Sequence, residues 1–592
     1  MQTNTQNETD KQSSSRRTWG MRLLKYASIA LFVCVMVIGL VFVRIAISPM
    51  SISSVADRIE SAASDLMAPG QILELEDAQV SLAEGGGLAL RLTDVRLTEG
   101  SLSLFSAPRI DLEIDFLSLL KQKFIPSQIY VPQLEAQLVR DKLGRFIIAG
   151  QDPGGLSQTF GPPVRSQADY YDPDEPEFVS LIYGMRRAMR PLAEEDFDKR
   201  PPRILIRDTK LHFTDLLADK SRLLDNVAFS YKPKGDDDND WRIDFAVDGR
   251  KGRIAFAMAE YKLDQTTDGI PGKSIEFRFA DVSLADIWPR FSEKARRFKF
   301  SSPFYGAARM DFDGRESLID MKIALDVGAG QLDFGDNDTA LLDEANFRLD
   351  WEPENRVLAL EFAQVLFGET GGQFKGVAVW PKDSAGEVKM VVEGQDITLD
   401  ARDNPNPSKK LNEIFVKARI GRESGIMTVD RFAAIADEGK VEGSGSLALV
   451  DDVLTSGMAF DVSPMPYDLL SQMWPVNIAG GARRWVLENI ESGHTTGGTI
   501  EATLTDKMFE RTPDDRLELP DEAVNGVFGL KDVSLKPFGD LAPAKNISGT
   551  GIFTGRTFLA SFTNGEFVSN SGHRLPISSG RFEIPDHAQR PA

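Results

Sequence analysis

The sequence predicts a mainly β protein, with an N-terminal transmembrane helix followed by an elongated, curled antiparallel β groove and a few short covering helices. Three observations predict this fold class. One uncharged run near the N-terminus is long enough to cross a bilayer. Beyond residue 70, apolar and polar residues alternate with a period of two, which is typical of strands with one dry and one wet face. Stretches with helical periodicity are few.

The first element is the apolar run from Tyr26 to Val43, which predicts a membrane anchor over residues 23–47. Basic residues precede it, and only Arg44 follows closely, so the positive-inside rule places the N-terminus in the cytoplasm. Residues 1–22 are polar and are predicted to be a disordered tail. The alternative is a cleaved signal peptide, but its one passable cleavage site, Ala46-Ile47-Ser48, is followed by Pro49.

The next element is a β region over residues 48–151, which we expect to begin with a short helix within 51–67. Residues 152–200 comprise a Pro-, Gly- and Asp-rich linker over 152–175 and an amphipathic helix over 177–191. Two more β regions follow, over 201–465 and 466–592, and the second contains a helix over 480–490. The clearest strand runs from Ile319 to Val327, where apolar residues alternate without a break.

A weak internal echo accompanies these strands. Asp281-Val282-Ser283, Asp461-Val462-Ser463 and Asp532-Val533-Ser534 each end an alternating segment. Their spacing is irregular, so they indicate duplicated long β segments and not a solenoid of fixed period.

Composition excludes several classes of function. The chain has 68 Lys and Arg against 89 Asp and Glu, a net charge of −21 that repels nucleic acid. The single cysteine and four scattered histidines provide neither a disulfide framework nor a Cys/His metal site. Gly272-Lys273-Ser274 mimics the end of a phosphate-binding loop but lacks the earlier glycine, so we interpret it as a turn between strands. We therefore predict no catalytic residue, metal or cofactor.

The apolar strand faces are the remaining candidates for function. About 25 strands spaced by about 4.8 Å make a sheet of about 120 Å, which must curl, split or stay partly uncovered. If it curls, its inner face becomes an apolar channel suited to acyl chains; a sandwich or barrel would instead hide that face. We predict that alternating apolar residues line this groove: Leu88, Leu90, Leu92, Ile319, Met321, Ile323, Leu325, Val327, Leu358, Leu360 and Phe362.

The order of features resembles a known family. The segments Leu88–Leu97, Phe105–Ile114, Leu117–Leu120, Ile129–Val131 and Leu138–Phe146 resemble the N-terminal region of the AsmA-like/YhdP family of Gram-negative envelope proteins. Trp474-Pro475, followed by Gly481–Ile490 and Gly493, resembles the central region of the YhdP branch. Chains of that branch are usually longer, so the resemblance implies a shorter branch, a truncated gene or a fragment.

The resemblance implies a single-pass inner-membrane protein whose periplasmic groove moves phospholipid toward the outer membrane. Its expected partners are phospholipid, the inner membrane and outer-membrane or envelope proteins, and not nucleic acid. Arg483, Arg484 and Trp485 would either hold lipid headgroups at a groove mouth or pack a helix on the sheet, its arginines paired with acids. The main rival function is a non-catalytic envelope assembly scaffold built of closed β-sandwiches.

Overall fold

The computed structural model describes most of the chain between residues 70 and 585 and short pieces before it. The described ranges are 70–82, 88–114, 126–141, 146–148, 202–216, 220–233, 239–249, 252–267, 269–283, 299–333, 339–383, 385–401, 403–450, 453–474, 480–505, 519–536, 543–569 and 571–585, with scattered residues within 36–61, 176–186 and at 508. Most of the predicted anchor, 23–47, lies outside them. No described helix is long and apolar enough to cross a membrane.

The described part of the chain is mainly β, as predicted, and its strands belong to two compact units. Unit 1 comprises residues 1–162, 189–234 and 243–248, and unit 2 comprises 163–188, 235–242 and 249–592. Strand β11 (Asn239–Asp248) contributes to both. Residues 201–234, predicted to belong to the central β region, therefore group with the N-terminal region.

Unit 1 is a mixed sheet. Its strands are β1 (Met50–Ser51), β2 (Gln71–Glu74), β3 (Asp77–Leu82), β4 (Leu88–Glu99), β5 (Leu102–Ile114), β6 (Pro126–Pro132), β7 (Glu135–Arg140), β8 (Phe146–Ile148), β9 (Arg203–Asp215) and β10 (Lys220–Lys232). Strand β9 pairs in parallel with both β6 and β7, which ties residues 203–215 to the N-terminal strands. Helical residues within 56–61 cover this sheet, as Ala56 lies in its buried cluster.

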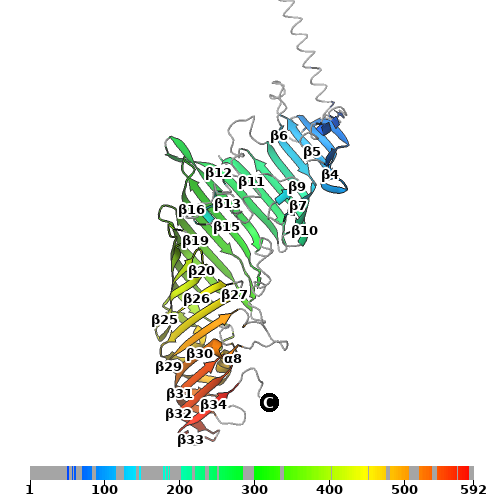
Figure 1. The fold of residues 1–592 in the computed structure, drawn as a ribbon. Coiled ribbons are helices and arrows are strands. Elements are labelled where there is room, and N and C mark those ends of the chain that lie inside the picture. The colour runs from blue at the N-terminus through cyan, green and yellow to red at the C-terminus, as the bar shows by residue number, and fades with distance from the viewer. Residues whose placement is uncertain are drawn as a thin grey trace, which may run out of the picture. The chain divides into compact units, whose positions relative to one another are not determined.

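Unit 2 is built on antiparallel strands that pair in chain order, and Figure 1 shows them following one another side by side from green to red. These strands are β12 (Arg253–Thr267), β13 (Ile270–Ser283), β15 (Pro303–Phe312), β16 (Leu318–Val327), β19 (Glu344–Glu352), β20 (Val357–Phe367), β21 (Thr370–Val379), β22 (Glu387–Leu399), β24 (Glu413–Gly421), β25 (Met427–Ala436), β26 (Gly439–Val450), β27 (Val453–Val462), β29 (Ile490–Thr505), β30 (Val524–Leu535), β31 (Ala544–Thr554), β32 (Phe558–Val568) and β34 (Gly580–Ile584).

Shorter elements lie along the borders of this sheet. Strands β23 (Lys409–Leu411), β28 (Met465–Pro466) and β33 (Arg574–Ile577) extend it, and β14 (Lys299–Phe300), β17 (Gly330–Asp333) and β18 (Thr339–Leu342) form a separate small sheet. Helix α8 (Gly480–Asn489) confirms the prediction over 480–490, whereas α7 (Tyr467–Met473) and the 3-10 turn η4 (Asp521–Ala523) were not predicted. Within 177–191, the described residues Phe178–Ser180, Ile182, Tyr183 and Arg186 are helical, as expected.

The Asp-Val-Ser echo has a backbone explanation at two of its three sites. Asp281 and Asp532 take the left-handed conformation, with φ of 55° and 51°, which aspartate tolerates better than most residues. Each lies at a register shift, and the valine that follows is buried. The echo therefore marks β-bulges that turn a β-branched side chain into the core. Asp461 lacks this conformation.

The segment Gly272-Lys273-Ser274 corrects a prediction, because it lies inside β13 and not in a turn. Lys273 donates a hydrogen bond of 2.8 Å to Glu260 on the neighbouring strand β12. The sequence correctly indicated that the phosphate-binding motif is incomplete. It placed the turn three residues too late, because the hairpin turn between β12 and β13 is at Gly269.

Candidate functional site

The main feature of unit 2 is an apolar face whose side chains line up across the strands. Residues paired in register share one face of an antiparallel sheet, so the pairings can be followed from strand to strand. One such row, the central row, contains only apolar residues and glycine. It runs Met258, Phe277, Ala308, Ile323, Leu349, Leu360, Gly376, Val392, Val416, Phe432, Gly443, Phe460, Ile500, Gly526, Phe553 and Phe558.

The rows on either side of the central row have the same character. Two residues away along the strands, Met310, Met321, Trp351 and Leu358 pair in turn. In the other direction, Leu325, Phe347, Ala363 and Phe374 do so. The apolar face is therefore several side chains wide as well as many strands long.

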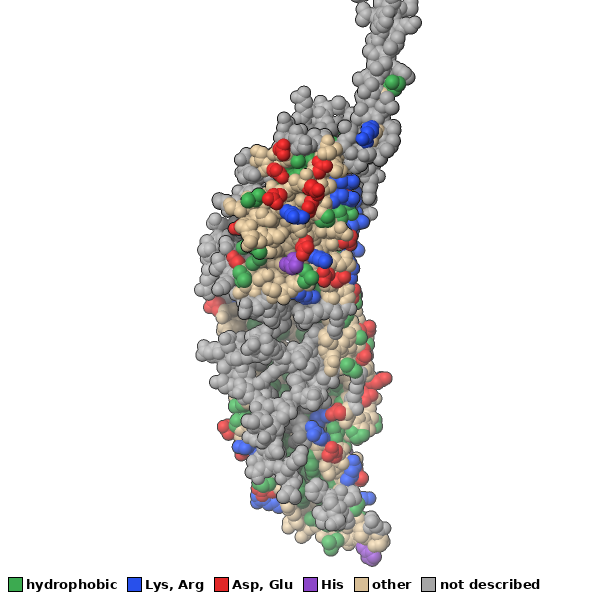
Figure 2. Space-filling view, turned by 90° about the vertical axis from the view of Figure 1, so that its right-hand side faces the viewer, with side chains coloured by type: hydrophobic (Ala, Val, Ile, Leu, Met, Phe, Trp, Pro, Cys, Tyr) green, Lys and Arg blue, Asp and Glu red, His purple; other side chains and the backbone are tan. Residues whose placement is uncertain are grey.

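Over strands β13 to β19, the opposite face of the sheet is polar. There, Glu276, Arg309, Lys322 and Asp350 pair in turn, directly behind the apolar rows. Arg278 contacts Glu276 at 3.1 Å, and Lys322 lies 4.0 Å from Asp350. Figure 2 shows a similar mixing of acidic and basic side chains in the upper part of its view, where Figure 1 places the strands of unit 1. Charge pairing of this kind, along a strand and between strands, keeps one sheet face in water.

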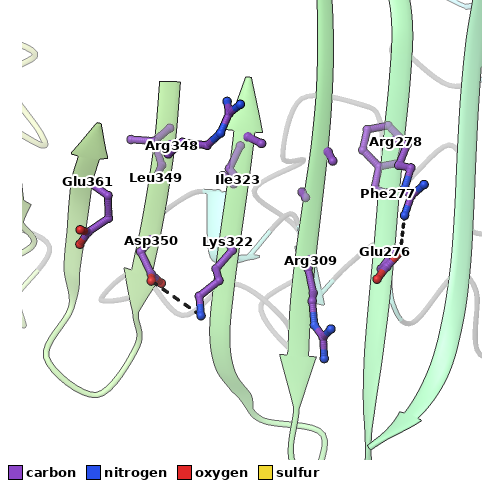
Figure 3. A pocket seen from close by; sticks show the side chains of 13 residues that line it. Glu276, Phe277, Arg278, Arg309, Lys322, Ile323, Arg348, Leu349, Asp350 and Glu361 are labelled. Carbon is purple, nitrogen blue, oxygen red and sulfur yellow. Dashed lines mark hydrogen bonds and ion pairs between the residues drawn. The ribbon is translucent and has the colours of Figure 1, made fainter. Parts of the chain in front are cut away.

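A shallow pocket lies on this polar face, and Figure 3 shows charged side chains of both signs around it. Ala307 and Ala324, which pair directly, are too small to fill the space between Arg278 and Arg348. Burial raises the pKa of Asp350, and Asp320 adds to the effect. Four cations and three carboxylates line the pocket, and the described residues contain no group of three or more His, Cys, Asp or Glu side chains that could hold a metal ion.

The predicted lining residues of unit 1 lie in a covered core. Leu90 and Leu92 are buried in one cluster with Ala56 and Val95, and Ile59 packs against it. Leu88 lies at the start of β4 and is half-buried. Because residues of the protein itself cover these side chains, Leu90 and Leu92 do not line an open surface.

Two predicted lining residues face the wrong way, and a bulge is the reason in each case. On β16, a register shift pairs Leu318 with Phe312, so Leu318 is buried and Ile319 is 38% exposed. On β20, a register shift pairs Phe362 with Arg348, on the charged face. A bulge moves every side chain beyond it to the other face, which a period-two pattern cannot reveal.

The other predicted residues do lie on the apolar face, but mostly where it is covered. Met321, Ile323 and Leu358 belong to a cluster with Val179 and Ile182 of the helical segment. Leu325 and Val327 pack with Leu342 of β18. Leu360, like Ile323, Leu325 and Leu358, is half-buried, but it belongs to neither of these clusters. We call the part of the face from Leu360 to Ile500 the half-buried stretch.

The half-buried stretch of the face contains residues that sequence reasoning did not select. Met390, Val392, Val416, Met458 and Phe460 all lie on it, between the clusters at its two ends. Their strands alternate as clearly as the predicted ones do, so the signal was present. What sets them apart is that they lie outside the clusters formed with the helical residues 178–186 and with α7, and such packing depends on elements distant in sequence.

Glycines on the apolar face lie beneath phenylalanine rings. A Cβ on Gly526 would come within 2.2 Å of the Phe553 ring, and one on Gly443 within 2.4 Å of the Phe460 ring. Each ring therefore lies across its glycine neighbour and not upright from the sheet. This arrangement keeps the surface of the face low where bulky residues would otherwise protrude.

Two of the three candidate residues on α8 are held by contacts with other parts of the protein. Arg483 is buried, binds Asp403 through two nitrogens and donates to the Trp474 carbonyl oxygen at 3.0 Å. Trp485 stacks on Phe582 with ring centroids 5.8 Å apart and contacts Phe558. Arg484 is exposed. Arg483 and Trp485 thus hold α8 on the sheet, and Arg484 is the member of the three that faces solvent.

Comparison with known proteins adds nothing to this geometry. No family model, curated protein or solved structure matches the chain.

Proposed function

We propose that this protein carries phospholipid acyl chains along the apolar face of unit 2, in the periplasm between the inner and outer membranes. The central row is the observation that carries the proposal. It gives an alkyl chain a path from strand to strand on which each contact is apolar. Each methylene that leaves water for such a surface gains about 0.8 kcal/mol.

The half-buried state of the row supports a transient ligand. A fully buried row would be an ordinary core, while a fully exposed one would favour aggregation. Between Leu360 and Ile500 the described side chains of the row are half-buried, so they retain apolar surface for a ligand to cover. Balanced charges on the opposite face keep that side of the sheet in water. Transfer needs no catalytic residue.

The N-terminal sequence supports a location at the inner membrane for this activity. The apolar run from Tyr26 to Val43 would anchor the chain in the inner membrane, with its basic tail in the cytoplasm. The resemblance to the AsmA-like/YhdP family supports the same arrangement. Outer-membrane or envelope proteins would be the further partners.

Two adjacent valines on β22 provide a direct test. Val392 belongs to the central row, whereas Val391 points to the opposite face and pairs with Val377 and Lys417. A photo-crosslinking amino acid is placed at each position in the full chain, which is then mixed with vesicles of phosphatidylethanolamine and phosphatidylglycerol. We expect a phospholipid adduct by mass spectrometry at Val392 and little at Val391. Equal labelling, or none at either, would refute the proposal.

The rival scaffold function predicts closed sandwiches, which need two facing sheets. The described strands of unit 2 instead pair in sequence order in one sheet, with one small three-stranded sheet beside it. No observation here favours the scaffold, and absence of lipid adducts would be its main support.

A further inference from the structure

A helical segment of the chain lies on the apolar face itself. We call the described helical residues Phe178, Val179, Ser180, Ile182, Tyr183 and Arg186 the covering segment. Val179 and Ile182 are buried in a cluster with Met310, Met321 and Trp351 of the sheet. Phe178 contacts the Trp351 and Trp380 rings edge to face, at 5.1 and 5.6 Å between centroids.

The sheet residues beneath the covering segment continue the surface proposed to carry lipid. Met310, Met321 and Trp351 form the row beside the central row, and Ile323 of the central row packs against the same cluster. The covering segment therefore presents a short apolar stripe to a surface that, further along the sheet, is half-buried. Its side chains and an acyl chain would compete for one site.

The covering segment also makes polar contacts with the sheet. Leu318 N donates to Tyr183 Oη at 3.0 Å, and Arg186 lies 4.0 Å from Glu316. The Arg186 guanidinium rests over the Phe312 ring, 4.0 Å from its centroid. Two buried donors in this region, Arg186 Nη1 and Trp351 Nε1, have no hydrogen-bond partner among the described residues. Unpaired buried donors destabilise the docked arrangement.

The place of the covering segment in the chain allows it to leave without unfolding a sheet. Residues 163–188 belong to unit 2, while the chain before and after them, 1–162 and 189–234, belongs to unit 1. The segment is thus an insertion between strands that pair elsewhere, and β8 and β9 lie on its two sides in sequence. Its removal would break none of the strand pairings of unit 2.

We propose that the covering segment is an internal plug, which occupies one end of the lipid path until an incoming acyl chain displaces it. This inference rests on the proposed function, because it concerns regulation of the same site. The docked segment shields Met321 and Trp351 from water when no lipid is present. A lipid that reaches this end replaces one apolar contact with another and releases the Arg186 guanidinium to water.

The test uses two reporter positions in the full chain. A photo-crosslinking amino acid replaces either Met321, beneath the covering segment, or Val392, on the half-buried stretch. Each reporter is combined with Ile182→Asp, which places a charge in the docked interface, and the phospholipid vesicles serve as the probe. Ile319→Asp is the matched control, because Ile319 lies on the same strand as Met321 but is exposed on the other face.

We expect Val392 to label lipid equally in all backgrounds. Met321 should label residues of the covering segment in the parent and the Ile319→Asp chain, and should gain roughly tenfold more lipid adduct with Ile182→Asp, since a buried isoleucine contributes enough packing for that shift. Ile182→Ala, with circular dichroism to check the fold, provides a milder displacement that should move labelling in the same direction.

The possible failures are distinguishable. Lipid at Val392 with unchanged labelling at Met321 in both Ile182 variants would show a permanent cover and overturn the plug alone. Lipid labelling at Met321 as strong as that at Val392 in the parent chain would also overturn the plug. Lipid adducts at neither reporter would overturn the proposed function, and the plug with it.

Discussion

Replacing Val392 by aspartate puts a carboxylate in the central row, where the paired neighbours are Gly376 and Val416. Two positions away along β22 are Met390 and Gly394, so neither the row nor the strand supplies a partner for the charge on this face. An acyl chain that crosses this strand must cover the carboxylate. A bare charge under hydrocarbon is too costly, so the group takes up a proton first.

The free energy needed to protonate this carboxylate sets the height of the barrier. The ordinary pKa of aspartate is about 3.9, so neutralisation at pH 7 spans about three units and costs about 4 kcal/mol, at about 1.36 kcal/mol per unit. Transfer past β22 should therefore slow by up to about a thousandfold. At pH 5 only about one unit remains, so the slowing falls to about tenfold. Lower pH restores transfer because it supplies the proton.

The assay follows a fluorescent phospholipid from donor to acceptor vesicles in the presence of the full chain, at both pH values. Val391→Asp is the control for the opposite face and should transfer at the parent rate. Val392→Asn adds polarity without a titratable group, so any defect it causes should not depend on pH. Parent-like transfer by a folded Val392→Asp chain at pH 7 would show that lipid does not cross the central row at this strand.

Three further experiments, two of them with a matched control substitution, test the architecture. Leu318→Ala should lower the unfolding free energy by about 2–4 kcal/mol, while Ile319→Ala changes it by less than about 0.5, and urea unfolding that ranked them in reverse would contradict the bulge in β16. Gly526→Val should destabilise the fold, because the added Cβ would lie 2.2 Å from the Phe553 ring, whereas Gly457→Val should be tolerated, because the nearest atom to its added Cβ is 3.8 Å away. Equal melting temperatures of the two variants would argue against a ring lying over Gly526. Asp403→Ala leaves Arg483 buried without its carboxylate partner and should lower the unfolding free energy by about 1–2 kcal/mol, less than for a fully buried pair because the Asp403 side chain is 54% exposed. An unchanged urea unfolding curve would show that this ion pair does not hold α8.

Much of the site could be predicted strand by strand. The alternation placed Met321, Ile323, Leu325 and Val327 together on one face, and they do share it. Alternation failed at Ile319 and Phe362, because a bulge depends on the pairing with the next strand and not on local sequence. It also could not distinguish Leu90, which lies in a closed core, from Val392, which is half-buried.

The sequence alone determined the mainly β character, the helix at α8 and the apolar face of the alternating strands, because side-chain direction along a strand is a local property with a period of two. Only the tertiary structure decided which residues of different strands align into the central row and which parts of that row are covered. Those outcomes depend on register, on bulges at residues such as Asp281, and on the docking of a segment that lies between strands of another unit. They arise from contacts between residues far apart in the chain, which a periodic pattern in the sequence does not reveal.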